Sequence, residues 1–177
     1  MKPTNLKTKN LILRSLEISD DKDMFAYASN PIVSKYTLWN PHTCIKESVG
    51  FINSVLNNPH ANECVWAIEY NQKLIGTAGF FDINIDNKSA EINYALSNDF
   101  RGKGLMVEAL EELFSFAFNK LHLVRIAAKC MQDNIASERV MIKLGMQYEG
   151  TLRSALYAKG SFHNMKLYSI LRKAAIK

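Results

Sequence analysis

The chain has 177 residues, 47% of them apolar and 22% charged, and its 22 basic and 17 acidic side chains give a formal net charge of +5. These proportions exclude a disordered or collagen-like chain, and the length is that of one domain, which we predict over residues 1–177. No run approaches 18 consecutive apolar residues and the first ten residues are polar, so we expect no membrane segment, no signal peptide and a cytoplasmic location.

The surplus of basic side chains leaves the partners open. A positive net charge favours anionic partners such as nucleic acids or phosphate-bearing cofactors, and an ordinary surface slightly rich in lysine is the alternative. No block of five like charges occurs and no basic run is interleaved with aromatic residues, so we expect no nucleic-acid partner. Cys44, Cys64 and Cys130 are far apart and form no CxxC pair, so we also expect no metal site.

The first third of the chain is predicted to form one strand and two helices. The apolar run Leu11–Leu16 indicates a strand. A helix follows, with N-cap candidates at 19–21 and an end at Asn30-Pro31. Residues 35–42 show no regular pattern. Thr43 is the expected N-cap of a second helix, which reaches Leu56 and ends at residues 57–59.

The rest of the chain first favours strands and then alternates strands with helices. Stretches at 64–70, 74–81 and 90–96, with short turns at 71–72 and 86–88, predict an antiparallel meander. Then come a helix over 105–118, a strand over 123–128, a helix over 135–144 and strands over 147–152 and 166–171. A right-handed crossover gives one parallel pair in this mixed sheet. We therefore predict an α/β fold, with an α+β mixed sheet flanked by helices.

The stretch from Ser97 to Met106, between a strand and the long helix, carries the clearest chemical signal. Gly102 and Gly104 let the backbone curl so that several N–H groups point into one concavity, and the following helix adds the positive end of its dipole. Such a loop binds phosphate, and Arg101 and Lys103 add charge, although a tight strand-to-helix connection is the alternative. The spacing is neither GxGxxG nor GxxxxGK[ST], which removes support for the common nucleotide motifs.

Arg101-x-x-Gly104-x-Met106 resembles the Arg/Gln-x-x-Gly-x-Gly/Ala signature of the GNAT acetyltransferases, which holds the pyrophosphate of acetyl-CoA. The strand at 90–94, the helix opening Asn134-x-x-Ser137 and the turn at 143–146 are similar to further elements of that family, in the same order. Residues 11–14, 36–42 and 168–171 resemble its Rim-type branch, named for N-terminal acetylation of ribosomal proteins. The resemblance covers nearly the whole chain, and implies acetyl-CoA as co-substrate and a mostly antiparallel sheet with one splayed parallel pair of strands.

The resemblance also implies the residues that contact the co-substrate. The loop from Arg101 to Met106 would donate backbone N–H groups to the pyrophosphate; Met106 departs from the Gly/Ala of the signature, which suits a backbone contact. Leu96 and Ser97 would end the strand that splays from its neighbour at 123–130, where free backbone groups can pair with the pantetheine arm. Asn134 and Ser137 would face the arm and the thioester; alternatively, Asn134 only caps its helix and Ser137 is incidental. The implied set is Leu96, Ser97, Arg101, Gly102, Lys103, Gly104, Leu105, Met106, Asn134 and Ser137.

Transfer of an acyl group to an amine needs a neutral amine and a proton for the departing thiolate. Glu91 resembles the glutamate that acts as base in some family members, with a solvent-facing charge or a structural hydrogen-bond partner as the alternative. Many relatives carry a tyrosine acid where this chain has Met141. In the Rim-type branch the serine three residues after the asparagine can replace it, so Ser137 is the predicted acid. Cys130 suggests an acyl-enzyme, but no histidine stands at a suitable spacing, which favours a buried packing residue.

The acceptor is the least determined part of the reaction. At pH 7 a lysine-type amine with a pKa of ~10.4 needs about 4.6 kcal/mol to become neutral, whereas an α-amine near ~7.8 needs only about 1.1 kcal/mol. An α-amine therefore needs little help from a base, and a protein N-terminal amine is favoured over a small-molecule amine. Tyr36 and Trp39 would line the acceptor side or pack on each other, and Asn164 stands where similar sequences often carry an acidic residue.

Together these residues predict an acetyl-CoA-dependent N-acetyltransferase in which the amine attacks directly in a ternary complex. A non-catalytic acyl-CoA-binding module is the alternative, because the usual tyrosine and the acidic residue are both absent. Members of the family are often dimers, so a homodimer stays open.

Overall fold

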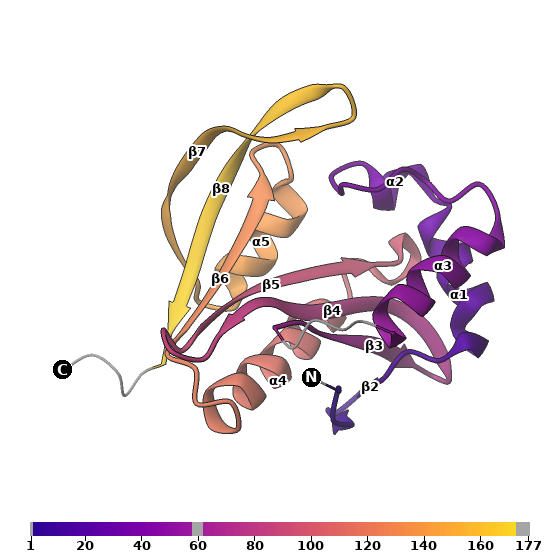
Figure 1. The fold of residues 1–177 in the computed structure, drawn as a ribbon, viewed down its shortest axis with the longest axis horizontal. Helices are drawn as coiled ribbons and strands as arrows, with labels where there is room; N and C mark the ends of the chain where they lie inside the picture. The colour runs from indigo at the N-terminus through magenta and orange to yellow at the C-terminus, as the bar shows by residue number, and fades with distance from the viewer. Residues whose placement is uncertain (1, 58–61, 173–177) are drawn as a thin grey trace.

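An eight-stranded mixed sheet runs through the middle of the molecule in the computed structural model, which describes residues 2–57 and 62–172 (Figure 1). The strand order is β1-β2-β3-β4-β5-β6-β8-β7. Within the described residues only β5 and β6 pair in parallel, and the other neighbours are antiparallel, which confirms the predicted mixed sheet. The strands are β1 (Leu6–Lys7), β2 (Ile12–Arg14), β3 (Cys64–Tyr70), β4 (Lys73–Asn84), β5 (Ser89–Leu96), β6 (Arg125–Met131), β7 (Gln147–Ala158) and β8 (Ser161–Leu171).

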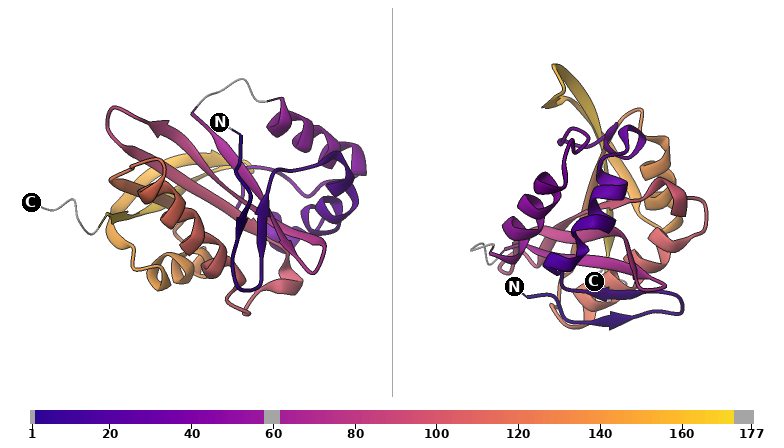
Figure 2. Two further views of the ribbon diagram at one scale, coloured as in Figure 1. Left: turned by 90° about the horizontal axis from the view of Figure 1, so that it is seen from below. Right: turned by 90° about the vertical axis from the view of Figure 1, so that its right-hand side faces the viewer.

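Helices cover both faces of the sheet, as the end-on view in Figure 2 shows. On one face lie α1 (Asp21–Ala28), α2 (Pro31–Ser34) and α3 (Ile45–Leu56); on the other lie α4 (Leu105–Asn119) and α5 (Ile135–Lys143). The alternation of side chains along β3 divides the core between the two faces. Trp66 and Ile68 belong to the larger core beneath α4, whereas Val65 and Ala67 belong to the smaller core beneath α1 and α3.

The same alternation fixes which side chains of β5 and β6 share a face. Ala90 and Ile92 of β5 and Ile126 of β6 are buried in the larger core with α4. The intervening side chains, Glu91 on β5 and Lys129 on β6, therefore lie on the opposite face, the side of α1 to α3.

The N-terminal part of the prediction needs four corrections. The predicted strand at 11–16 is shorter, Ile12–Arg14, and it pairs with β1, which was missed. The C-cap of α1 is Ser29, just before the expected stop at Asn30-Pro31, and Asn30 caps the single turn α2, because Pro31 suits the first helical position. Cys44, not Thr43, is the N-cap of α3; the amide and hydroxyl of Thr43 instead donate to the carboxylate of Glu47. That helix has its C-cap at Asn57, and positions 58 and 59 of its predicted end lie outside the described residues.

The last two strands are about twice as long as predicted, because β7 and β8 form one long hairpin closed by a turn at Lys159-Gly160. The register shifts twice along it, between Tyr148 and Gly150 and between Leu152 and Leu156. The first shift lies inside the predicted strand at 147–152, and the second, just beyond Leu152, breaks the period of two that identifies a strand in a sequence where the prediction ended. In the parts of the chain described here, no helix is long and apolar enough to cross a membrane.

Candidate active site

The loop before α4 has the conformation expected of a phosphate cradle. Gly102 and Gly104 both have φ of 78°, a left-handed conformation that side chains disfavour. Gly104 is the N-cap of α4, and its carbonyl accepts the N–H of Glu108 at 3.0 Å. The N–H groups of the first turn of a helix have no partner inside the helix, so they face out of its N-terminal end.

Leu105 and Met106 show why the signature tolerates a methionine. Both side chains are buried in the larger core, with exposed fractions of 4% and 5%. Their side chains anchor the start of α4, and only their backbone is left to meet a ligand. Arg101 and Lys103 are exposed beside the loop, and the Lys103 Nζ lies 4.9 Å from the centre of the Phe100 ring. The loop thus fits an anionic diphosphate held by backbone N–H groups, with two cations nearby.

β5 and β6 diverge beside this loop (Figure 1). They pair only from Ser89–Arg125 to Glu91–Ala127, while β5 continues to Leu96 and β6 to Met131. Ser97 N–H donates to the carbonyl of Ile75 on the β4 side at 2.8 Å. Antiparallel ladders alternate the direction of their backbone groups, so the C=O group of Ile92 and the N–H and C=O groups of Tyr94 and Leu96 point into the gap.

The β6 side of the gap is built in the same way. Gln132 N–H donates to Asn164 O at 2.9 Å, which directs the even-numbered backbone groups toward β8. The backbone groups of Lys129 and Met131 therefore face β5 across the gap. These two strand edges face one another without pairing. They therefore fit an extended ligand arm whose amide groups can bond to the backbone groups of the strands. Of the two predicted strand-end residues, Leu96 directs its backbone into the gap, whereas Ser97 lies beyond β5 and its N–H is already bonded.

Glu91 lies at the closed end of the gap, at the last residue pair that joins β5 to β6. Its Oε2 accepts a hydrogen bond from Lys129 Nζ at 2.6 Å. The side chains of Glu91 and Lys129 are 21% and 38% exposed, respectively. The candidate base is therefore a partly exposed member of an ion pair that bridges the two diverging strands.

Ser137 lies in the first turn of α5 and is held from both sides. Its N–H donates to Oδ1 of Asn134, 3.2 Å away, which confirms that Asn134 caps the helix. Its Oγ lies 2.8 Å from the Tyr94 Oη, and the Tyr94 hydroxyl is also 3.2 Å from the Ser137 carbonyl oxygen. The structure thus brings Asn134 and Ser137 together with Tyr94, which the sequence interpretation had not selected.

Two positions discussed above in connection with catalysis are occupied by core residues. Met141, which stands where many members of the family carry a tyrosine acid, is fully buried in the larger core. Cys130 is also buried, and burial raises the pKa of its thiol to about 11. A thiol with such a pKa stays protonated at neutral pH, which favours direct attack over an acyl-enzyme on Cys130.

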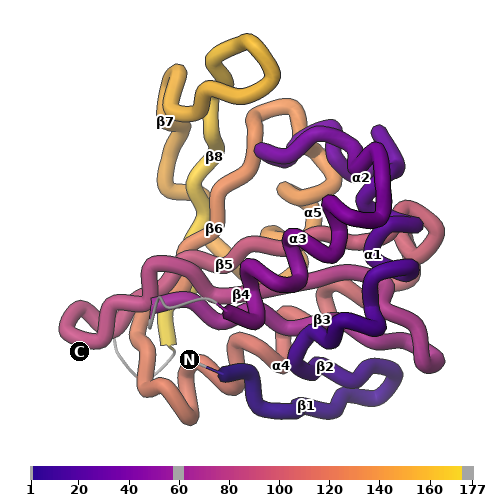
Figure 3. The backbone as a smooth tube through the Cα atoms, turned by 45° about the vertical axis from the view of Figure 1, so that its right-hand side comes forward, coloured from indigo at the N-terminus to yellow at the C-terminus, as the bar shows by residue number. Residues whose placement is uncertain are grey.

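A cavity of about 500 Å³ lies where β6 ends, and it brings the predicted acceptor residues Tyr36 and Asn164 together. Its lining comes from the segment after α2, from the end of β6 and from the start of β8, and Figure 3 shows the backbone of these segments. Lys159 in the hairpin turn donates to the carbonyl of Ser34, which ties this turn to α2. Trp39 instead packs against the smaller core and the His42 ring, 5.5 Å away. The lining residues are Lys35, Tyr36, Met131, Gln132, Asp133, Phe162, His163 and Asn164.

The Asn164 side chain is largely occupied by bonds within the protein. Its Oδ1 accepts the N–H of Ser154 at 2.9 Å, and its Nδ2 donates to Oε1 of Gln132 at 3.1 Å. Asn164 thus connects the bulged part of β7 to the end of β6, and so helps to shape the cavity wall.

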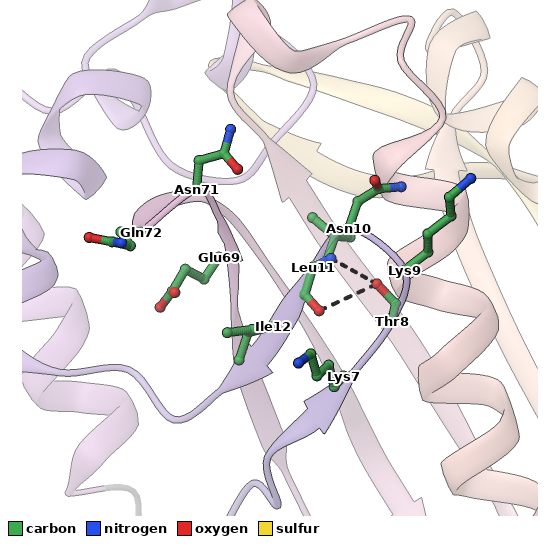
Figure 4. A pocket seen from close by; sticks show the side chains of 9 residues that line it. All are labelled: Lys7, Thr8, Lys9, Asn10, Leu11, Ile12, Glu69, Asn71 and Gln72. Carbon is green, nitrogen blue, oxygen red and sulfur yellow. Dashed lines mark hydrogen bonds between the residues drawn. The ribbon is translucent and has the colours of Figure 1, made fainter.

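A second hollow, of about 250 Å³, lies beside the N-terminal hairpin (Figure 4). Its lining comes from residues 7–12 and from Glu69, Asn71 and Gln72, and the figure shows Thr8 bonded to the backbone of Leu11. The carboxylate of Glu108, in α4, binds the Thr8 hydroxyl and the backbone N–H of Asn10 at 2.5 and 2.7 Å. This hairpin therefore steadies the helix that follows the glycine-rich loop.

The sequence interpretation missed Tyr94, Lys129 and Asp133. The period of two along β5 could have placed Tyr94 on the same face as Ile92. Nothing in the local pattern identifies its partner, Ser137, which is 43 residues away. Lys129 and Asp133 gain their positions from the end of β6, and such positions depend on the packing of the whole sheet.

These features, a glycine-rich loop before a helix and two diverging parallel strands, fit an extended diphosphate ligand bound along a split sheet. The model of the acetyltransferase (GNAT) domain matches residues 10–147, and the chain belongs to the GNAT acetyltransferases. It is an acetyl-CoA-dependent N-acetyltransferase, and the cradle and the gap fit the pyrophosphate and the pantetheine arm of that co-substrate.

Individual relatives agree with this assignment. The chain is 33% identical over 171 residues to the N-acetyltransferase p20 of Bacillus licheniformis, covering 95% of this chain and 96% of that protein. It is 25% identical over 170 residues to the ribosomal-protein-serine acetyltransferase of Escherichia coli, covering 88% and 95%, and this similarity supports the Rim-type branch. Among solved structures, the Microcin C7 self-immunity acetyltransferase MccE in complex with acetyl-CoA and AMP has a TM-score of 0.83 at 26% identity, with 93% of each chain covered.

Proposed function

We propose that the protein acetylates the N-terminal α-amine of a protein or peptide, which enters through the cavity at the end of β6. The observation that carries this proposal is the make-up of that cavity, in which one carboxylate, Asp133, and one ammonium group, Lys35, accompany aromatic and amide side chains. A polyamine with several positive charges favours a cluster of carboxylates. The N-terminus of a peptide offers one ammonium group followed by amides and side chains, which suits this mixed lining.

The similarity to the ribosomal-protein-serine acetyltransferase supports the same acceptor class. The energetics of the amine supports it as well. An α-amine with a pKa near ~7.8 is partly neutral at pH 7, whereas a lysine ε-amine must give up a proton at a cost of about 4.6 kcal/mol. A small-molecule amine is the second acceptor class that the cavity volume admits.

In the proposed reaction the neutral amine attacks the thioester carbon directly, and the carbon–sulfur bond breaks. Glu91 takes the proton that the amine loses, directly or through a water molecule. The Ser137 hydroxyl gives a proton to the departing sulfur and is reprotonated from water, to which Glu91 returns the proton that it took. One proton leaves the nitrogen and one reaches the sulfur, so the reaction exchanges no net proton. Because a thiol has a pKa near ~8.5, a weak acid suffices for this step.

The wider setting of the protein is part of the same proposal. We propose a cytoplasmic protein in which residues 1–177 form one acetyltransferase domain, with neither nucleic acid nor membrane as its partner. The buried free thiols Cys64 and Cys130 suit a reducing compartment. A homodimer stays a prediction, and sedimentation of the purified chain with and without acetyl-CoA measures it.

The test is release of CoA thiol with a panel of amines. The panel contains a short peptide with a free α-amine, the same peptide acetylated at its N-terminus and carrying one lysine, and spermidine. We expect turnover with the first and at least tenfold less with the other two. Turnover with spermidine or the ε-amine alone would overturn the proposed acceptor. Binding of acetyl-CoA without turnover on any amine would favour the binding module.

A further inference from the structure

The hydroxyl of Tyr94 lies against Ser137, although the two residues belong to different layers of the fold. Tyr94 comes from β5, at the point where this strand has parted from β6, and its side chain reaches the first turn of α5. Its Oη is 2.8 Å from the Ser137 Oγ and 3.2 Å from the Ser137 carbonyl oxygen. This contact thus connects the strand edge that faces the gap to the predicted acid.

The hydrogen bonding allows two arrangements of the two hydroxyl protons. A carbonyl oxygen only accepts, so when Tyr94 donates to it, the Ser137 hydroxyl must donate to Tyr94. When Tyr94 donates to Oγ instead, the proton of Ser137 is free to turn toward another acceptor. Tyr94 therefore controls where the Ser137 proton points.

Tyr94 keeps its own proton throughout the working pH range, because burial raises the pKa of its phenol. It can donate a hydrogen bond to Ser137, while full transfer of its proton would leave a buried phenolate. The surrounding turn is also held firmly. Glu138, the next residue of α5, accepts hydrogen bonds from Lys166 Nζ and Tyr168 Oη of β8, at 2.8 and 2.7 Å. Ser137 thus has little freedom apart from its hydroxyl rotation.

We propose that Tyr94 is the positioning residue for Ser137 and directs its hydroxyl proton toward the departing sulfur. This inference rests on the proposed role of Ser137. As the carbon–sulfur bond breaks, Tyr94 donates to Oγ, and the Ser137 proton passes to sulfur. Tyr94 retains its proton, and Ser137 regains one from water.

A double-mutant cycle tests the coupling between the two residues. Tyr94→Phe removes the phenol oxygen and retains the ring, so we expect kcat to fall by about 3- to 10-fold. The KM for acetyl-CoA should stay within about twofold, because the ring still fills its site. Ser137→Ala should lower kcat further, and adding Tyr94→Phe to it should change kcat by less than about twofold.

Tyr148→Phe is the matched control, because the Tyr148 hydroxyl also bonds a side-chain hydroxyl, that of Thr151, 2.7 Å away on the exposed strand β7. It should leave kcat unchanged. Thermal unfolding of all variants separates lost catalysis from lost folding. Slow hydrolysis of acetyl-CoA without an amine expels the same thiolate, so it gives a second readout for the same cycle.

Each result decides the proposal. A kcat for Tyr94→Phe equal to wild type would overturn it. So would an equal loss from Tyr94→Phe in the wild-type and Ser137→Ala backgrounds, since Tyr94 would then act independently of Ser137. Wild-type kcat in Ser137→Ala would overturn it together with the assigned acid. The acceptor proposal fails separately, through the amine panel, because the cycle is scored by ratios between variants on whichever amine reacts.

Discussion

The Nζ atom of Lys129 lies 2.6 Å from Oε2 of Glu91, and this ion pair bridges β5 and β6 where the two strands part. By the alternation of side chains, both residues are on the face of the sheet that carries α1 to α3, whereas Tyr94 and Ser137 meet on the face that carries α5. The candidate base and the candidate acid thus approach the gap from opposite faces. This arrangement suits an amine that attacks from one side and a sulfur that leaves on the other.

The first prediction concerns Glu91 as the base. Glu91→Gln should lower kcat/KM for an α-amine peptide at pH 7 by about sixfold, because neutralising an amine with a pKa near ~7.8 needs about 1.1 kcal/mol. The loss should shrink toward pH 9, because an amine with a pKa near ~7.8 is then already neutral. Initial rates between pH 6 and 9 measure it. Lys129→Gln is the control, because it removes the same ion pair and keeps the carboxylate; an equal, pH-independent loss in both variants would point to a structural pair.

The second prediction concerns the phosphate cradle. Saturating acetyl-CoA should raise the melting temperature of the wild-type protein by about 5–10 °C. Gly104→Glu should abolish this rise, because it places a strained side chain and a negative charge where the diphosphate binds. Gly145→Glu is the matched control: Gly145 has a φ of 75° against 78° for Gly104, and a Cβ meets open space at both positions. A retained shift in Gly104→Glu would contradict the assigned cradle.

The third prediction concerns pH and stability. Hydrogen bonds from Arg125 and Ser169 hold the pKa of Glu149 at about 2, below the ordinary value of 4.5. A lowered pKa in the folded state stabilises the fold above pH 4.5, and this contribution disappears as the pH falls toward 2. Glu149→Gln should therefore lower the free energy of unfolding at pH 7 by about 1 kcal/mol.

Denaturant unfolding at pH 7, 5 and 3 checks this prediction. The difference between wild type and Glu149→Gln should be smaller at pH 3 than at pH 7. Glu111→Gln, on the exposed side of α4, should show no such trend. A difference that grows on acidification would show that the ion pair with Arg125 does not stabilise the fold.

The fourth prediction concerns the acceptor cavity. Tyr36→Ala and Phe162→Ala remove side chains that line it, and should raise the KM of a peptide acceptor by about tenfold with little change in the KM of acetyl-CoA. Leu38→Ala serves as the control, because Leu38 is 69% exposed in the same segment and is not among the lining residues. Steady-state kinetics with both substrates varied separates the two KM values. A rise confined to acetyl-CoA would place the cavity on the donor side.

The local parts of this fold were predictable because each follows from neighbouring residues. Gly102 and Gly104 indicate a turn that needs left-handed backbone conformations. The alternation of Ala90 and Ile92 with Glu91 defines the two faces of β5. The position of Asn134 likewise predicts that its side chain caps α5, since the amide N–H that it binds is only three residues away. In each case the deciding contact is formed within one turn or one strand.

The remainder depends on contacts that no local pattern contains. β1 has two residues and is stabilised by pairing with β2, so its own sequence carries no strand signal. The contact between Tyr94 and Ser137 needs α5 to cross behind β5, and that between Glu91 and Lys129 needs the parallel register of β5 and β6. The half of the β7–β8 hairpin next to its turn was missed because the register shift between Leu152 and Leu156 disturbs the alternation of side chains.

Those bulges bear on the behaviour of the protein at high concentration. β7 is the outermost strand of the sheet, with twelve residues and most of its side chains exposed. A straight edge of that length would be a template on which strands from other molecules could add and begin aggregation. The two register shifts divide β7 into paired runs of two or three residues. The irregularities that shape the cavity wall thereby also protect the free edge of the sheet against self-association.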